Sequence, residues 1–283
     1  MIAILGGLGA AAGWALSTLC SSRSSRLIDP ASVVAWVMLV GLVIAAPLAA
    51  FEGVPGDLEG SSVVWLAASG AGNVGGLLLA YKALRVGQVA LVSPIVSAEG
   101  AVAALIAVAA GETLGAASAV ALVVIAAGIA MAAMPSAPRS APEQARPWEA
   151  VPLALVAAVA FGVSLYATAR AGDQLPAAWV VLSARLIGAV LLAVPLALLG
   201  RLRLTRQALP LVIVSGICEV LAFYSFIAGA RHGIAVAAVL ASQFAALAAV
   251  AAYFVFGERL ARVQLAGVTT LLVGVAVLTA LRA

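Results

Sequence analysis

Three charged side chains, Glu99, Arg185 and Glu219, lie inside long apolar runs of this chain, whereas the other charged residues lie between such runs. A charge at the centre of a bilayer costs about 3 kcal/mol on insertion scales, so such residues usually face a partner or a water-filled cavity. These three residues are therefore the first candidates for binding a substrate. The two carboxyls, Glu99 and Glu219, are also the candidates for proton coupling.

The depths of Arg185 and Glu219 in their runs can be compared. At about 1.5 Å per helical residue, Arg185 lies about 12 Å and Glu219 about 16 Å from the same membrane surface. An ion pair between neighbouring helices is therefore geometrically possible. The pair could line a cavity and meet a zwitterionic substrate or protons, or it could simply neutralise two buried charges during assembly. Glu99 likewise could serve protons or a substrate ammonium group, or be a satisfied structural carboxyl.

A polar stripe follows one face of the first apolar run, because Trp14, Ser17, Thr18 and Ser21 recur at helical spacing. It fits a cavity lining, and it fits hydroxyl bonding between packed membrane helices equally well. Polar and aromatic residues in other runs are weaker candidates of the same kind. The candidate cavity residues are Trp14, Ser17, Asn73, Ser97, Glu99, Tyr166, Arg185, Glu219, Tyr224 and Gln243.

The composition indicates the elements that position these residues. Apolar residues make up 65% of the chain, charged residues 9%, and the mean hydropathy is +1.21. A soluble domain is nearer to half apolar and a quarter charged. In lipid every backbone polar group must be satisfied internally, and no segment alternates like a barrel strand, so we expect helices. Ten runs are about long enough to span a bilayer, at 2–22, 31–51, 62–81, 88–110, 115–134, 150–169, 177–199, 208–230, 234–256 and 263–281.

An internal repeat divides the chain into two copies. Gly111-Glu112 recurs 146 positions later as Gly257-Glu258, and Ser69 and Ser215 keep the same offset, while Ser17 and Ser164 differ by 147. The sequence predicts a first five-helix repeat over 1–134, a proline-rich linker over 135–149 and a second repeat over 150–283. Since five is an odd number, the second copy must enter the membrane inverted. The predicted fold class is an all-α integral membrane protein with ten transmembrane helices in two inverted five-helix repeats.

Each copy resembles a repeat of the EamA type, from the drug/metabolite transporter superfamily. The resemblance implies a ten-helix carrier with a central cavity, often an exporter of amino acids, metabolites or drugs. Leu240 stands at the repeat position of Pro94, so a kink is expected in the first copy and not in the second. The matching residues are Tyr81 to Ala90, Val92-Ser93-Pro94-Ile95 and Gly111-Glu112-Thr113-Leu114 in the first copy, and Gly233, Gly257-Glu258-Arg259-Leu260, Gly267 and Gly274 in the second.

No motif in the sequence indicates an enzyme. The chain has one histidine, Lys82 is its one lysine, and neither a phosphate-binding glycine loop nor Cys/His metal spacing occurs. We therefore expect no catalysis, metal or cofactor, and no ATP-driven pumping. No basic cluster is interleaved with aromatics, which argues against nucleic acid. The expected partners are a small-molecule substrate and the lipid bilayer, with protons as a candidate coupling ion, and the expected assembly is a monomer or weak homodimer.

The predicted function is secondary transport of a small polar or amphipathic metabolite, by alternating access and with export as the expected direction. The alternatives are a passive channel or facilitator, against which the sparse charges argue, and a structural membrane protein without transport. We expect the prokaryotic inner membrane. Loops after odd-numbered runs carry eleven Lys and Arg residues and the others three. The positive-inside rule then places both termini outside, whereas the family resemblance implies the reverse.

Overall fold

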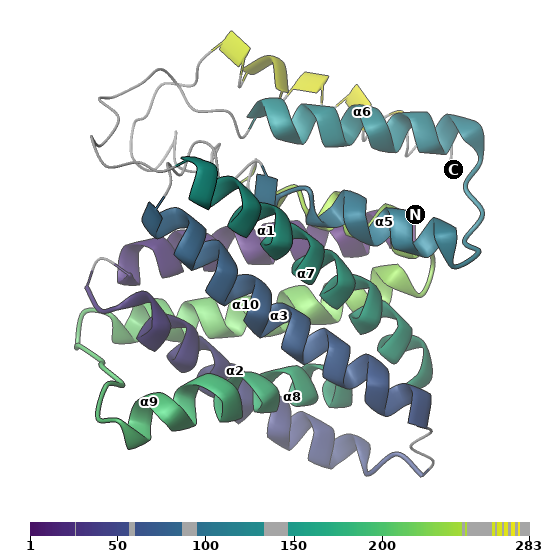
Figure 1. The fold of residues 1–283 in the computed structure, drawn as a ribbon. Coiled ribbons are helices and arrows are strands. Elements are labelled where there is room, and N and C mark those ends of the chain that lie inside the picture. The colour runs from purple at the N-terminus through teal and green to yellow at the C-terminus, as the bar shows by residue number, and fades with distance from the viewer. Residues whose placement is uncertain are drawn as a thin grey trace.

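The computed structural model describes residues 1–25, 27–56, 60–86, 95–132 and 147–244, together with residue 247 and separate positions from 262 to 277. Within these residues the secondary structure is helical throughout, which confirms the all-α class (Figure 1). The first half contains α1 (Ile2–Ser24), α2 (Pro30–Glu52), α3 (Gly60–Val86), α5 (Glu99–Ala109) and α6 (Ala116–Ala132). The second half contains α7 (Pro147–Gln174), α8 (Ala177–Gly188), η1 (Ala189–Ala193), α9 (Val194–Leu198), α10 (Leu209–Ala230) and α11 (Ile234–Ala241).

Six helical segments are long and apolar enough to cross a membrane: Ile2–Ser21, Pro30–Glu52, Gly60–Ala80, Glu149–Gln174, Ala177–Leu198 and Leu209–Ala230. They correspond to predicted runs one, two, three, six, seven and eight. The apolar helices α5 and α6 are shorter. The count of ten spanning helices therefore remains a prediction. Residues 88–94, residues 135–146 of the predicted linker, and Gly257-Glu258 lie outside the described residues.

Local signals fix the start of α2 as the sequence requires. Asp29 precedes Pro30, and its carboxylate accepts a hydrogen bond from the backbone N–H of Ser32 at 3.0 Å. Pro30 has no N–H to satisfy at this first helical position, where proline is favoured. The Ser32 hydroxyl also accepts from the backbone N–H of Arg203 at 3.0 Å. The start of α2 is thus fastened to the loop that precedes α10.

The helices of the two halves pack in matching pairs. Helix α1 runs along α10, and α3 runs along α7; α1 also packs against α11, and α5 against α7. If α1 is exchanged with α7, α3 with α10 and α5 with α11, the α1–α10 contact becomes the α3–α7 contact. The same exchange turns the α1–α11 contact into the α5–α7 contact. Such an exchange is what two copies of one unit related by a twofold axis would produce. The inversion of the second copy in the membrane stays a prediction.

Small residues allow these helices to approach closely. At Gly6 of α1 a side chain would collide with the backbone of Gly229 of α10, and at Gly72 of α3 a Cβ would lie 2.8 Å from the carbonyl oxygen of Ala160 of α7. Close approach through glycine is typical of helices in lipid, where van der Waals packing drives association. The glycine content of the chain is therefore explained mainly by helix packing.

The repeated Gly-Glu step has a structural role in the described copy. The Glu112 carboxylate accepts a hydrogen bond from the backbone N–H of Ala235 at 3.1 Å, at the N-terminus of α11. A carboxylate at this position satisfies a free helix N–H and favours the positive end of the helix dipole. Because Glu112 belongs to the first half and α11 to the second, this contact also ties the two halves together.

Candidate substrate site

An ion pair lies at the middle of two spanning helices. The Nη2 atom of Arg185 on α8 lies 3.3 Å from the Oε2 atom of Glu219 on α10. Arg185 is 1% exposed, and the side chain of Glu219 is 20% exposed. The pairing that the helix depths allowed is therefore present. The pair keeps one accessible carboxylate beside a buried guanidinium.

Three further neighbours hold the Arg185 guanidinium in place. Its Nη1 atom donates to the Sδ atom of Met38 at 3.3 Å, and its Cζ atom lies 4.8 Å from the ring centroid of Phe223. The stem rests in a notch at Gly41 of α2, where a Cβ would lie 2.8 Å from Arg185 Cδ. In the part of the chain that the structure describes, Nε has no hydrogen-bond partner. Arg185 is thus firmly positioned while its hydrogen-bonding capacity is only partly used.

Serine hydroxyls complete the surroundings of Glu219. The Ser17 hydroxyl donates to Oε1 of Glu219 at 3.1 Å. Ser17 Oγ also lies 2.8 Å from Ser215 Oγ, which in turn lies 2.8 Å from Ser21 Oγ. The polar stripe of α1 therefore bonds to α10, as the packing interpretation predicted, and it also reaches the buried ion pair.

Aromatic rings form the apolar side of the same site. The ring of Trp14 stands edge-on to Phe223 with centroids 5.2 Å apart, and the centroid of Phe226 lies 6.1 Å away. An aromatic face attracts a cation, so Phe223 stabilises Arg185 from one side and packs against Trp14 from the other. We call Trp14, Ser17, Arg185, Glu219 and Phe223 the central polar cluster.

Sequence analysis missed two members of this site, Phe223 and Ser215. Both lie four residues from Glu219 along α10, so helical spacing places all three on one face. Met38 was missed as well. No pattern in the sequence indicates which side chain of α2 meets Arg185, because that depends on how α2 crosses α8.

Glu99 is the first residue of α5 and is buried, with 6% of its surface exposed. It lies where α5 packs against α7 and α11: a Cβ at Gly162 of α7 would lie 2.9 Å from the Glu99 carbonyl oxygen. Among the described residues, no ion pair or hydrogen bond reaches its carboxyl. Glu99 is therefore a buried carboxyl whose charge is not compensated by any ion pair within the described residues.

A turn interrupts the helix on the N-terminal side of Glu99. Residues 97 and 98 form the turn, and the N–H of Ala98 donates to Ile95 O at 3.1 Å. The second half has the same feature at residues 242 and 243, where the N–H of Gln243 donates to Leu240 O at 3.3 Å. Pro94, where the first copy is expected to be kinked, lies outside the described residues, so this kink stays a prediction. The turn at residues 242 and 243 interrupts the helix of the second copy without a proline. A serine hydroxyl assists the second turn, since Ser242 Oγ donates to Val239 O at 2.9 Å.

The other predicted residues lie at separate places. The ring of Tyr166 stands edge-on to Trp65 with centroids 5.8 Å apart, between α7 and α3. Asn73 on α3 and Tyr224 on α10 are half-buried. Ser97 is buried at the turn before α5, and Gln243 is buried at the turn after α11. The Nε2 atom of Gln243 has no hydrogen-bond partner among the described residues.

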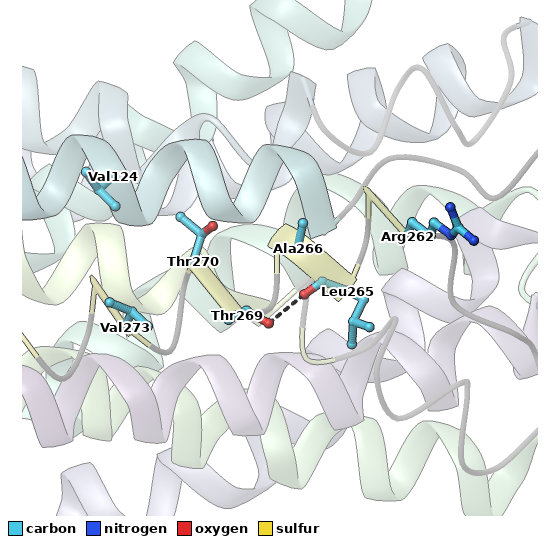
Figure 2. Close-up of a pocket in the computed structure, with 7 residues that line it drawn as sticks. All are labelled: Val124, Arg262, Leu265, Ala266, Thr269, Thr270 and Val273. Atoms are coloured by element: carbon cyan, nitrogen blue, oxygen red, sulfur yellow. Dashed lines mark hydrogen bonds between the residues drawn. The ribbon is translucent and has the colours of Figure 1, made fainter.

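A pocket of about 560 Å³ lies between α6 and the C-terminal positions, at the edge of the bundle (Figures 1 and 2). Figure 2 shows the hydrogen bond from Thr269 Oγ1 to Leu265 O, at 2.9 Å, beside this pocket. None of the candidate residues lines it, so the pocket is separate from the central polar cluster. Its lining residues are Val124, Arg262, Leu265, Ala266, Thr269, Thr270 and Val273.

The apolar spanning helices, the pairwise exchange of contacts and the buried ion pair define an integral membrane protein built from two related halves. The model of the EamA-like transporter family matches residues 1–134 and 148–280. The chain belongs to the EamA-like transporter family, and is thus a membrane transporter of the drug/metabolite transporter type.

Solved structures support the fold. The chain is similar to one titled "Crystal structure of protein", with a TM-score of 0.79, 22% identity, and coverage of 99% of this chain and 97% of that chain. At this identity the likeness shows a shared fold. No curated protein matches the chain.

Proposed function

We propose that this chain is a secondary transporter that moves a small polar or amphipathic metabolite, such as an amino acid or a drug-like molecule, in the direction of export. The observation that carries the proposal is the Arg185–Glu219 pair, held at mid-span beside Trp14 and Phe223. Buried charges in membrane helices are costly and mark substrate or ion pathways. A site with both signs of charge and an aromatic wall suits a ligand with a charged end and an apolar body.

Each candidate residue has a role in this proposal. Arg185 binds an acidic group of the substrate, Glu219 binds a basic group or a proton, and Glu99 carries a proton. Trp14 and Ser17 line the cavity beside the pair. The remaining candidates extend the lining in other conformations of the transporter: Asn73, Ser97, Tyr166, Tyr224 and Gln243.

Alternating access requires that the two halves move relative to each other. Hydrogen bonds between the halves occur at both ends of the helices. Where α2 begins, the N–H of Arg203 donates to Ser32 Oγ at 3.0 Å and Trp36 Nε1 donates to Arg203 O at 2.9 Å. Further bonds lie at the opposite end, at the first turns of α1, α3 and α11. Ser225 Oγ donates to Gly6 O at 3.0 Å, Ser62 Oγ donates to Gln174 Oε1 at 2.8 Å, and Glu112 accepts from Ala235. We infer that the alternate state breaks the hydrogen bonds at one of these two ends. The turns before α5 and after α11 are suitable places for bending.

Counterflow in proteoliposomes tests the proposal. Vesicles preloaded with one unlabelled amino acid, amine or drug from a panel should accumulate the same labelled compound transiently and saturably. A double variant, Arg185→Leu/Glu219→Leu, should lose this accumulation, whereas removal of the exposed pair Arg170–Asp173 should leave it unchanged. Flux that does not saturate would indicate a passive channel, and no flux for any compound would contradict transport of this substrate class. A reporter fused at Ala283, active in one compartment, decides the orientation.

A further inference from the structure

A chain of three hydroxyls leads to the carboxylate of Glu219. Ser21 Oγ lies 2.8 Å from Ser215 Oγ, which lies 2.8 Å from Ser17 Oγ, and Ser17 donates to Glu219 Oε1 at 3.1 Å. A hydroxyl has one proton to donate and can accept two hydrogen bonds. Because Ser17 donates to the carboxylate, one direction carries protons along the chain, in which Ser21 donates to Ser215 and Ser215 donates to Ser17 Oγ. Ser215 Oγ also lies 3.4 Å from the backbone carbonyl oxygen of Ser17, a longer contact for the same proton.

The exposure of these residues changes along the chain. Ser21 is half-exposed and lies one turn before the end of α1, whereas Ser215 is 0% and Ser17 4% exposed. The hydroxyls therefore connect a more accessible position near the end of α1 with an acid at mid-span. Water is not needed between the four groups, since each step is already within hydrogen-bonding distance.

The equivalent contact of α3 with α7 contains the same hydroxyls without the acid. Ser69, Ser164 and Thr168 stand at the repeat positions of Ser215, Ser17 and Ser21. Ser69 Oγ hydrogen-bonds to Thr168 Oγ1, and Ser164 Oγ donates to the backbone carbonyl of Ser69 at 2.7 Å. Asn73 occupies the repeat position of Glu219 and cannot titrate. Joining two helices thus requires the hydroxyls and does not require the carboxylate.

We propose that Ser21, Ser215 and Ser17 form the path by which protons reach Glu219, which rests on the proposed proton-coupled transport. A proton that arrives on Ser21 Oγ displaces the proton of Ser21 to Ser215, that of Ser215 to Ser17, and that of Ser17 to Glu219 Oε1. Each serine ends neutral with its hydroxyl reversed, and must rotate back before the next transfer. The neutral Glu219 no longer compensates Arg185, which then becomes available to the acidic group of a substrate.

Other charged and titratable groups surround this path. Arg185 of α8 faces Oε2 of Glu219. Glu99 of α5 is a second buried carboxyl. Cys20 of α1 and Cys218 of α10 are half-buried free thiols on the same two helices. Met38 contributes a neutral thioether from α2. Ser17 is hydrogen-bonded to Oε1 of Glu219, and Arg185 is hydrogen-bonded to Oε2. A proton from Ser17 therefore reaches the carboxylate oxygen that does not contact the guanidinium.

The test measures protonation of Glu219 directly, by time-resolved infrared spectroscopy of the protein in lipid after a jump to lower pH. The band to follow is the carboxylic-acid band that Glu219→Gln removes. Ser215→Ala and Ser17→Ala should each slow its appearance by about tenfold or more. Ser215→Thr, which keeps a hydroxyl, should restore the rate. Ser69→Ala, the matched change in the other half, should leave the rate unchanged.

Two results would overturn the path. One is protonation of Glu219 at the original rate in the Ser215→Ala protein. It would mean that water reaches the carboxyl directly, through the 20% of the Glu219 side chain that is exposed. The other is the absence of any band assignable to Glu219 at any accessible pH. Counterflow measured on the same vesicles is a separate readout. If no compound shows counterflow while Glu219 is protonated at the original rate, the transport proposal is contradicted and the proton path is retained.

Discussion

The two halves of the molecule place different side chains in equivalent positions. In α8, Arg185 enters the notch at Gly41 of α2; in α2, Met38 enters the notch at Gly188 of α8, where a Cβ would lie 2.7 Å from Met38 Cγ. Both pairs of positions keep an offset of 147 in the sequence. The two side chains thus occupy reciprocal sites and touch each other, yet one is charged and the other is neutral.

The same contrast recurs one helix further on, where Glu219 of α10 matches Asn73 of α3. Hydroxyl bonds lie beside both residues, in the contact of α1 with α10 and in that of α3 with α7. The notches and hydroxyls build the helix contacts in both copies, whereas the charges of Arg185 and Glu219 occur only in the second copy, where we propose that they bind the substrate. An asymmetric substrate fits such an arrangement, because two identical halves would offer the same group twice.

The largest expected effect follows from breaking the ion pair. Arg185→Ala or Glu219→Ala strands a charge in the interior, which costs about 3 to 5 kcal/mol for a buried pair. Because Glu219 is partly exposed, we expect a loss of about 3 kcal/mol in the free energy of unfolding. Thermal unfolding in detergent measures the loss. Arg185→Leu/Glu219→Leu should recover much of it, because neither charge remains; additive losses would show that the pair contributes no coupling.

The exposed pair Arg170–Asp173, with atoms 3.8 Å apart, provides the control for that measurement. Its removal should change stability by about 0.5 kcal/mol or less, since solvent screens such pairs.

The two notches allow a direct comparison of the halves. Gly41→Ala pushes against Arg185 Cδ and Gly188→Ala against Met38 Cγ and Sδ, and overpacking of this kind costs about 1 to 3 kcal/mol. Met38 is flexible and can move aside, so we expect the smaller loss at Gly188. Unfolding curves of the two variants give the difference. Gly41→Ala should also reduce counterflow; equal effects of both variants on transport would remove the functional distinction between the halves.

A smaller effect is expected at the start of α11. Glu112→Ala removes the acceptor for the N–H of Ala235 and should cost about 0.5 to 2 kcal/mol, as for the loss of a helix cap. Hydrogen exchange at the first amides of α11 should increase. Glu258→Ala, at the repeat position, should give a loss of similar size if the two copies use the Gly-Glu step in the same way. If Glu258→Ala leaves stability unchanged, the capping role of the Gly-Glu step is confined to the first copy.

The smallest effect on stability is expected for Glu99→Gln, which keeps the shape of the side chain. Transport should lose its dependence on the pH gradient while thermal unfolding changes little, because the variant cannot release a proton. Flux measured with and without a pH gradient tests this. Unchanged pH dependence would leave Glu99 as a structural carboxyl, and Glu219 would then be the acid to test by the same substitution.

The ion pair was predictable because the rise per residue of a helix is fixed, so depth in the membrane follows from residue number. The all-helical class was predictable for a similar reason, since lipid leaves the backbone few alternatives. The partners Met38 and Phe223 depend on how helices cross, which one sequence does not reveal. The turn at residues 242 and 243 was not predictable, because it forms without the proline on which the kink prediction relied.

The π-helix η1 lies between Gly188 and Pro195 on the helix that carries Arg185. Gly41 and Gly188 are 147 positions apart, whereas Pro47 and Pro195 are 148 apart, so the second copy holds one residue more across this short interval. A π-turn is how an α-helix takes in a single inserted residue. The insertion is absorbed locally. Arg185 keeps its place against Gly41 before the π-turn, and Pro195 keeps a position equivalent to that of Pro47 after it. Duplicated halves can therefore differ in length without losing their shared geometry, and deleting one residue within 189–193 should return the segment to a continuous α-helix like that of α2.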